Sequence, residues 1–183
     1  MTTEKLSPND WIAAGFHTLA NDGPKALQIK ILAERLKATK GSFYWHFKDL
    51  PAFKGAILET WKAKVATEVI EEVVLNKTPE EQFKALIEYA ARPAPEKFGG
   101  AKIEPALRAW ALSDPDVAQM LNEIDDTRLQ FIAQLLKQLG HQNDALPPLF
   151  YAAYIGLDDL CSKGKADIKA SLTALASAIN ASG

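Results

Sequence analysis

The chain has 183 residues, of which 48% are apolar and 24% charged, a balance typical of a globular protein with one large or two small domains. No apolar run approaches the roughly 20 residues that span a bilayer, and the start MTTEKLSPND lacks a signal-peptide pattern. The single cysteine, Cys161, excludes an internal disulfide framework and a cysteine-rich zinc site. We therefore expect a cytoplasmic protein, in which Cys161 serves packing or, as the alternative, thiol sensing.

The net charge of −2 hides an asymmetry along the chain. Residues 1–62 contain nine Lys and Arg against six Asp and Glu, which leaves twelve against seventeen in residues 63–183. Between Gln28 and Lys48 there are five basic residues and one acid, Glu34. A basic patch of this kind can neutralise phosphates while the acidic remainder limits indiscriminate binding, although it is also compatible with a solvated surface.

Capping residues and apolar stripes at helical spacing predict an all-α fold of about nine helices. Ser7 to Asp10 and Thr78 to Glu81 carry the strongest start signals, a capping hydroxyl followed by a proline and an acid. We expect helices over about 7–23, 29–36, 40–47, 49–75, 78–91, 103–112, 113–139, 148–162 and 166–181.

Residues 28–47, QIKILAERLKATKGSFYWHF, predict two short helices joined by a three-residue turn. Phe43 and Phe47, at i and i+4, should face inward, which leaves Tyr44 and Trp45 with little core to fill. Aromatic clusters usually belong to a core, but the two short helices match a helix-turn-helix better than a bundle hairpin. In that motif the second helix enters the major groove of DNA.

The residue types of this segment suit contact with DNA. Lys40 can reach a guanine edge or a phosphate, and Gly41 lets the backbone approach closely. Hydroxyl, amide and imidazole groups can donate to phosphate oxygens. The residues expected to contact DNA are Gln28, Lys30, Thr39, Lys40, Gly41, Ser42, Tyr44, Trp45, His46 and Lys48.

The stretch from Trp11 to Trp61 resembles the N-terminal domain of TetR-family transcriptional regulators. The resemblance rests on residues 11–14 (WIAA), Gly23, residues 32–36 (LAERL) and residues 41–47 (GSFYWHF). It implies a DNA-binding domain over residues 1–48 and a helical effector-binding and dimerisation domain over residues 49–183.

The resemblance also implies individual roles. Lys40, Gly41 and Trp45 match positions that meet the major groove, whereas Gln28, Thr39, Ser42, Tyr44 and His46 match positions that contact mainly the DNA backbone. This chain has Lys37 where the family usually has a glycine in the turn, and Leu50 where it usually has a phosphate-binding lysine. Lys48 or Lys54 would have to replace that lysine.

The last two predicted helices have apolar and alanine-rich sides that suit pairing with a second copy, although burial within a monomer is the alternative. The resemblance implies a homodimer, with an interface that we expect to contain Leu149, Ala153, Gly156, Leu157, Leu160, Leu172, Ala174, Leu175 and Ala178. The large and basic side chains of the middle helices are candidates for an effector pocket: Tyr89, Phe98, Arg108, Trp110, Met120, Arg128, Phe131 and Tyr151.

The sequence shows no nucleophile–base pair, metal-ligand cluster or phosphate loop, so we expect neither an enzyme nor a cofactor or metal site. The function expected is that of a regulator, most simply a repressor that an unidentified small molecule releases from a palindromic operator. The alternative is a helical small-molecule-binding or adaptor protein that has lost operator binding.

Overall fold

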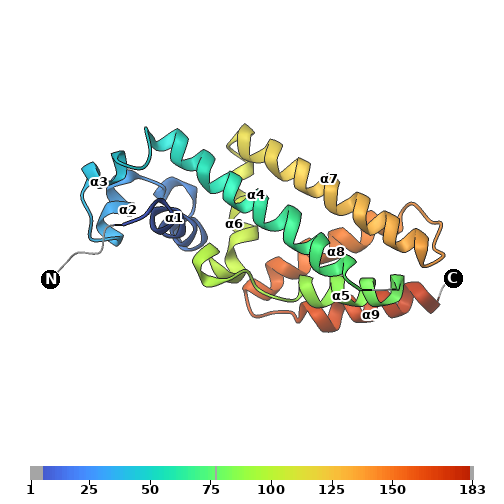
Figure 1. Ribbon diagram of the computed structural model, residues 1–183. Coiled ribbons are helices and arrows are strands. Elements are labelled where there is room, and N and C mark those ends of the chain that lie inside the picture. Colours follow the sequence, from blue (N-terminus) through green and yellow to red (C-terminus); the bar gives the residue numbers. More distant parts are fainter. Residues whose placement is uncertain (1–5, 77, 182–183) are drawn as a thin grey trace. The chain divides into compact units, whose positions relative to one another are not determined.

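A computed structural model describes residues 6–76 and 78–181, without the side chains of residues 65–68 and 70. Within this described part, the regular structure is helical, with nine α-helices and three short 3-10 helices (Figure 1). The predicted all-α class is confirmed. None of the helices in these residues is both long and apolar enough to cross a bilayer.

The chain forms two compact units, and each is taken by itself. The first unit consists of Met1–Lys62 and Ala94–Ala118, and the second of Ala63–Pro93 and Gln119–Gly183. These limits differ from the division at residue 48 predicted from the sequence. That division concerns function and stays a prediction.

Three helices at the start of the first unit are α1 (Pro8–Asp22), α2 (Ile29–Arg35) and α3 (Lys40–Tyr44). The first part of α4 (Leu50–Val74), the 3-10 turns η2 (Glu96–Phe98) and η3 (Gly100–Lys102), and α6 (Ile103–Ala111) complete it with the start of α7 (Pro115–Gln138). The 3-10 turn η1 (Pro24–Ala26) connects α1 to α2.

The core of the first unit is aromatic. Trp11, Phe16, Phe43 and Phe53 are fully buried, and the Trp11 and Phe43 rings meet edge to face with centroids 5.3 Å apart. Phe98 packs on Phe16 at 5.5 Å, which joins the η2 turn to α1. The segment after residue 93 is therefore part of the unit that contains the helix-turn-helix.

The start of α1 is a capping box. The hydroxyl of Ser7 accepts a hydrogen bond from the Asp10 N–H, and the Asp10 carboxylate accepts one from the Ser7 N–H at 2.7 Å. The backbone and hydroxyl hydrogen bonds from Ser7 hold the pKa of Asp10 below its ordinary value of 3.8.

The second unit contains the remainder of α4 and α7 with α5 (Pro79–Ala90), α8 (Leu146–Ser162) and α9 (Ile168–Ala181). Its core is formed by apolar residues of α5, α7, α8 and α9, among them Phe83, Phe150 and Leu172. Lys169 of α9 pairs with Glu88 of α5 at 2.8 Å, and the hydrogen bond from Lys169 lowers the pKa of Glu88.

Candidate nucleic-acid interface and ligand cavity

The turn between α2 and α3 is a Schellman motif. The Ala38 N–H donates to the Ala33 carbonyl at 2.8 Å, and the Lys37 N–H donates to the Glu34 carbonyl at 3.2 Å. Lys37 itself has a φ of 51°, in the left-handed region that favours glycine. The turn thus keeps a left-handed backbone although a lysine occupies the position.

Thr39 caps α3, as the sequence predicted. Its hydroxyl oxygen accepts a hydrogen bond from the Ser42 N–H at 3.2 Å. The hydroxyl hydrogen is not used in this bond, so it can donate to a phosphate oxygen.

Two phenylalanines hold α3 against the rest of the first unit. Phe43 is fully buried and Phe47 is 8% exposed, as expected from their spacing. Their rings lie 5.4 Å and 5.0 Å from the Phe53 ring of α4. The predicted helix over 40–47 is corrected here, because α3 ends at Tyr44. Trp45 and His46 form a turn through which the chain brings Phe47 onto Phe53 and enters α4.

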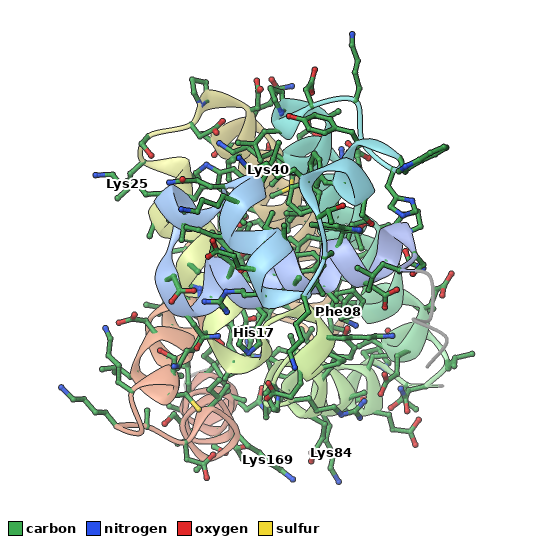
Figure 2. All side chains as sticks on the ribbon, turned by 90° about the vertical axis from the view of Figure 1, so that its left-hand side faces the viewer. His17, Lys25, Lys40, Lys84, Phe98 and Lys169 are labelled. Atoms are coloured by element: carbon green, nitrogen blue, oxygen red, sulfur yellow. The ribbon has the colours of Figure 1, made fainter. Side chains whose placement is uncertain are left out.

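Tyr44 and Trp45 lie outside this core, with 56% and 84% of their surface exposed. These two adjacent aromatic side chains gain little from burial within their own chain and are accessible to another molecule. Figure 2 looks onto this end of the first unit, where Lys40 is labelled on the pale blue ribbon of α3.

The other residues expected to contact DNA are also accessible. Gln28, Lys30, Thr39, Lys40, Gly41 and Lys48 are exposed, and Ser42 and His46 are half-buried. The side-chain amide of Gln28 donates to the Lys25 carbonyl at 3.0 Å, and Lys30 lies 3.9 Å from Glu34 on the same helix. We refer to these ten residues together as the α3 surface.

Gly41 has no structural need to be a glycine. A Cβ atom placed there would meet only the Thr39 hydroxyl at 3.6 Å, an ordinary contact. Its φ is not positive. The absence of a side chain at Gly41 thus creates room on the α3 surface for a close approach by another molecule.

Of Lys48 and Lys54, the two lysines expected as replacements for a lysine at Leu50, Lys54 is engaged by another side chain. Lys54 points its ammonium group at the ring of Trp110, 5.4 Å from the centroid, which engages it within the first unit. Lys48 is exposed next to α3.

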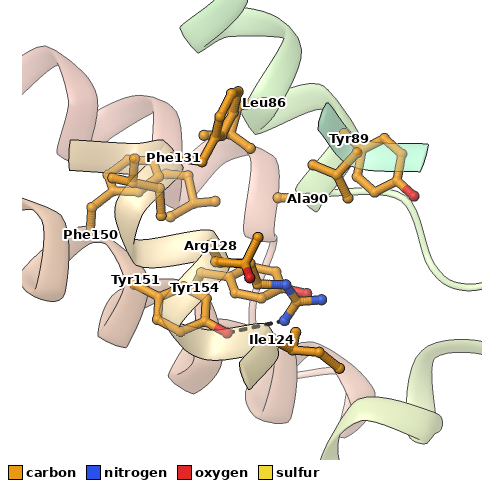
Figure 3. A pocket seen from close by; sticks show the side chains of 13 residues that line it. Leu86, Tyr89, Ala90, Ile124, Arg128, Phe131, Phe150, Tyr151 and Tyr154 are labelled. Carbon is orange, nitrogen blue, oxygen red and sulfur yellow. Dashed lines mark hydrogen bonds between the residues drawn. The ribbon is translucent and has the colours of Figure 1, made fainter. Parts of the chain in front are cut away.

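The second unit contains a cavity between its helices, which we call the second-unit cavity (Figure 3). Its volume is about 70 Å³. Its described lining consists of Val69, Leu86, Tyr89, Ala90, Ile124, Thr127, Arg128, Phe131, Ile132, Phe150, Tyr151, Tyr154 and Leu172.

Four of the eight predicted effector residues line this cavity: Tyr89, Arg128, Phe131 and Tyr151. The other four do not. Phe98, Arg108 and Trp110 belong to the first unit, where Arg108 pairs with the buried Glu104 at 3.2 Å and Trp110 donates to Asp114 at 3.0 Å. Met120 is buried in the second unit, away from the lining.

Sequence reasoning missed Tyr154, Ile124 and Phe150 as lining residues. A signal was present, because Ile124, Arg128 and Phe131 recur at i, i+4 and i+7 on α7, and Tyr151 and Tyr154 share a face of α8. Polar side chains of α7 and α8 form hydrogen bonds with each other at this wall of the cavity. Arg128 Nη1 donates to the Tyr151 hydroxyl at 3.1 Å, and that hydroxyl donates to Asp125 at 2.7 Å.

The predicted dimer residues lie mostly at the surface of α8 and α9. Leu149 and Leu160 are 54% and 41% exposed. Gly156, Ala174 and Ala178 are exposed, and Ala153, Leu157 and Leu175 are half-buried. Leu172 is corrected, because it is fully buried in its own protomer and lines the second-unit cavity.

This fold also occurs in other proteins of known structure. No family model matches the sequence, and no curated protein is detectably similar to it. Solved structures match over nearly the whole chain. A protein described as a TetR-family transcriptional regulator, from Rhodococcus sp., is 17% identical with a TM-score of 0.71, over 94% of this chain and 97% of its own.

Two further structures agree with this result. A transcriptional regulator from Saccharomonospora viridis, solved in complex with choline, has a TM-score of 0.76 at 15% identity, over 91% of this chain and 93% of its own. A regulator described as a TetR/AcrR family member has a TM-score of 0.77 at 15% identity, over 94% and 99%. The chain therefore has the fold of the TetR-family transcriptional regulators.

Proposed function

We propose that this protein is a DNA-binding transcriptional regulator that reads its operator with the α3 surface. The observation that carries the proposal is the exposure of Tyr44 and Trp45 beside Lys40, on a short helix that Phe43 and Phe47 hold in place. Exposed aromatic and basic groups at the second helix of a helix-turn-helix suit contacts with bases and phosphates.

The regulator we propose is a homodimer and a repressor that a small molecule releases from a palindromic operator. The exposed apolar residues of α8 and α9 support pairing with a second copy of the chain. A two-fold symmetric dimer of this kind would read the two half-sites of a palindromic operator. The second-unit cavity supports a small-molecule effector. The neighbour from Saccharomonospora viridis holds choline, so a protein of this fold can hold a small ligand.

The test is selection of bound sequences from a random DNA library, followed by affinity measurements on the enriched site at several salt concentrations. We expect Lys40→Ala to weaken binding and to reduce the slope of log affinity against log salt by about one. Lys84→Ala is the matched control, because it removes the same charge from an exposed position of α5 in the second unit. Equal effects of the two substitutions, or no enriched sequence at low salt, would contradict the proposal.

A second candidate function is a small-molecule-binding or adaptor protein without operator binding. It is favoured by Leu50 at the phosphate-contact position together with the engagement of Lys54 by Trp110. The same selection distinguishes the two functions, since an adaptor would dimerise and bind ligand but enrich no DNA sequence.

A further inference from the structure

Gly41 and Trp45 lie on the same face of the α3 surface. Trp45 directly follows α3 and keeps a helical backbone, with a φ of −71° and a ψ of −24°. The two residues are therefore about one helical turn apart, on the side opposite the buried Phe43. Among the described residues, a Cβ atom at Gly41 would meet only the Thr39 hydroxyl, so the Trp45 indole leaves this face open.

The Trp45 indole offers a partner an apolar ring face and a single N–H donor. Tyr44 packs its ring against Phe43, with centroids 5.5 Å apart, whereas Trp45 is largely exposed. An exposed indole gains free energy on binding chiefly when an apolar group of the partner covers its ring. In the major groove of DNA, the apolar group on a base edge is the C5 methyl group of thymine.

The hydrogen-bonding groups next to this indole are mainly donors. Residues 35–48 contain no Asp, Glu, Asn or Gln, the side chains that usually accept from the amino groups of adenine and cytosine. The Thr39 hydroxyl oxygen already accepts a hydrogen bond from a backbone N–H of α3, and the Lys40 ammonium group only donates. Guanine and thymine suit such a surface, because their major-groove edges carry acceptors and no amino group.

We propose, on the function proposed above, that the α3 surface reads the keto bases guanine and thymine in the major groove. Lys40 donates to N7 and O6 of a guanine, and the Trp45 indole packs on the C5 methyl group of a thymine. Gly41, between them in the sequence, lets the backbone of α3 come close to the bases. The two side chains start roughly 7.5 Å apart along the helix axis, so both contacts fall within one half-site.

Base analogues in the operator enriched by selection test this proposal, because each removes one group and keeps the base pair. Deoxyuridine in place of thymidine removes the C5 methyl group, and 7-deazaguanine in place of guanine removes N7. Each analogue is placed in turn at every matching position of one half-site, and fluorescence anisotropy measures binding by the full chain. We expect one deoxyuridine to weaken binding about fourfold, the value of one buried methyl group. One 7-deazaguanine should weaken it about tenfold, the value of a charge-assisted hydrogen bond.

Substitutions assign each effect to its side chain. Trp45→Ala should bind the deoxyuridine duplex as well as the unmodified one, whereas Trp45→Phe, which keeps an apolar ring, should retain the difference. Lys40→Ala should remove the effect of 7-deazaguanine. Lys30→Ala is its control, because Lys30 lies on α2 beside Glu34 and its loss should weaken binding to both duplexes alike. A deoxyuridine effect that persists in Trp45→Ala, or a 7-deazaguanine effect that persists in Lys40→Ala, would overturn the assignment.

The outcomes separate this inference from the proposed function. A selection that enriches no duplex would contradict the regulator and the base reading together. An enriched operator whose affinity is unchanged by every deoxyuridine and every 7-deazaguanine would support the regulator and overturn the reading of guanine and thymine. A Trp45→Ala variant that binds all duplexes more weakly by one common factor, with the deoxyuridine effect intact, would make Trp45 a contact to the DNA backbone and overturn its role at thymine.

Discussion

At the scale of single residues, Lys37 has a Cβ atom but adopts a left-handed backbone conformation that favours glycine. The same pair of hydrogen bonds closes α7 at Gly140 and α8 at Gly164, where φ is 92° and 68°. The turn after α2 uses a lysine for the same task at a φ of 51°. The Lys37 side chain is exposed, so the lysine occupies this position without a steric conflict of its side chain with the core.

We predict that Lys37→Gly raises the free energy of unfolding by about 1 kcal/mol, since a left-handed backbone strains any residue with a Cβ atom. Ala38→Gly is the control next to it, because its backbone is not left-handed and glycine there only increases the freedom of the unfolded chain. Urea unfolding of both variants measures the difference. Stabilisation by both substitutions, or by neither, would contradict the strain at Lys37.

At Gly41 we predict a substitution that weakens DNA binding without lowering stability. Gly41→Ala should leave stability unchanged or slightly raised, because the added methyl group meets only the Thr39 hydroxyl at 3.6 Å. It should weaken operator binding by about 1–3 kcal/mol, the cost of a mismatched base pair, since the methyl group occupies the space that DNA would enter. Unfolding curves and DNA titrations on the same preparation report the two effects separately. Full operator affinity in this variant would show that DNA does not approach at Gly41.

At the scale of elements, α1 and α4 pack closely because α1 has a glycine at the crossing. A Cβ atom at Gly15 would lie 2.6 Å from Ile57 Cδ1 and 2.8 Å from Phe53 Cζ, both on α4 and both fully buried. We predict that Gly15→Ala lowers the free energy of unfolding by about 1–3 kcal/mol through overpacking.

Gly55 on α4 is the matched control for this prediction. No atom lies within 4 Å of a Cβ built at Gly55, so Gly55→Ala should raise the free energy of unfolding by about 0.5–1 kcal/mol. The two variants make the same chemical change in two helices of one unit. If thermal unfolding shifted both midpoints in the same direction, the close crossing of α1 and α4 would not be the cause.

The capping box of α1 makes a prediction about pH. Folding lowers the pKa of Asp10, so the folded state favours the carboxylate; its contribution to stability is present above pH 3.8 and is lost as the pH falls through the lower, folded pKa. Asp10→Asn should therefore lower the melting temperature near pH 6 and have a smaller effect at the acid end of the folded range. A constant difference between the two proteins from pH 6 down to pH 3 would be the contrary outcome.

At the scale of the whole molecule, the proposed pairing through α8 and α9 would let two α3 surfaces act on one operator. Leu149 is 54% exposed on α8, and with Leu175 and Ala178 of α9 it lines an open groove in the second unit. The proposed dimer covers this groove with the same helices of a second copy.

We predict that Leu149→Asp raises the dimer dissociation constant about tenfold or more, because a carboxylate in an apolar contact has no partner. Leu112→Asp is the control, since Leu112 is 89% exposed in the first unit and outside the proposed contact. Sedimentation equilibrium gives the association state of both variants. A monomeric wild type, or a Leu112→Asp variant that dissociates as readily, would reject pairing through α8.

The sequence by itself determined the helical class, most helix starts and the composition of the α3 surface. These are local properties: Ser7 with Asp10 and Thr78 with Glu81 form capping boxes within four residues, and Phe43 with Phe47 follows from helical spacing. A helix-turn-helix is short enough for its pattern to be read from about twenty consecutive residues.

Only the tertiary structure decided which distant segments share a core. The ring of Phe98 belongs with Phe16 of the first unit and therefore not with a ligand pocket, a contact between residues 82 positions apart. Arg128 of α7 and Tyr151 of α8 meet in a hydrogen bond at the second-unit cavity. The helix α3 ends at Tyr44, and Phe47 packs on Phe53. Helical periodicity predicts on which face of its own helix a residue lies, but not which other helix that face packs against. The packing partner depends on how the apolar faces of all the helices are buried together.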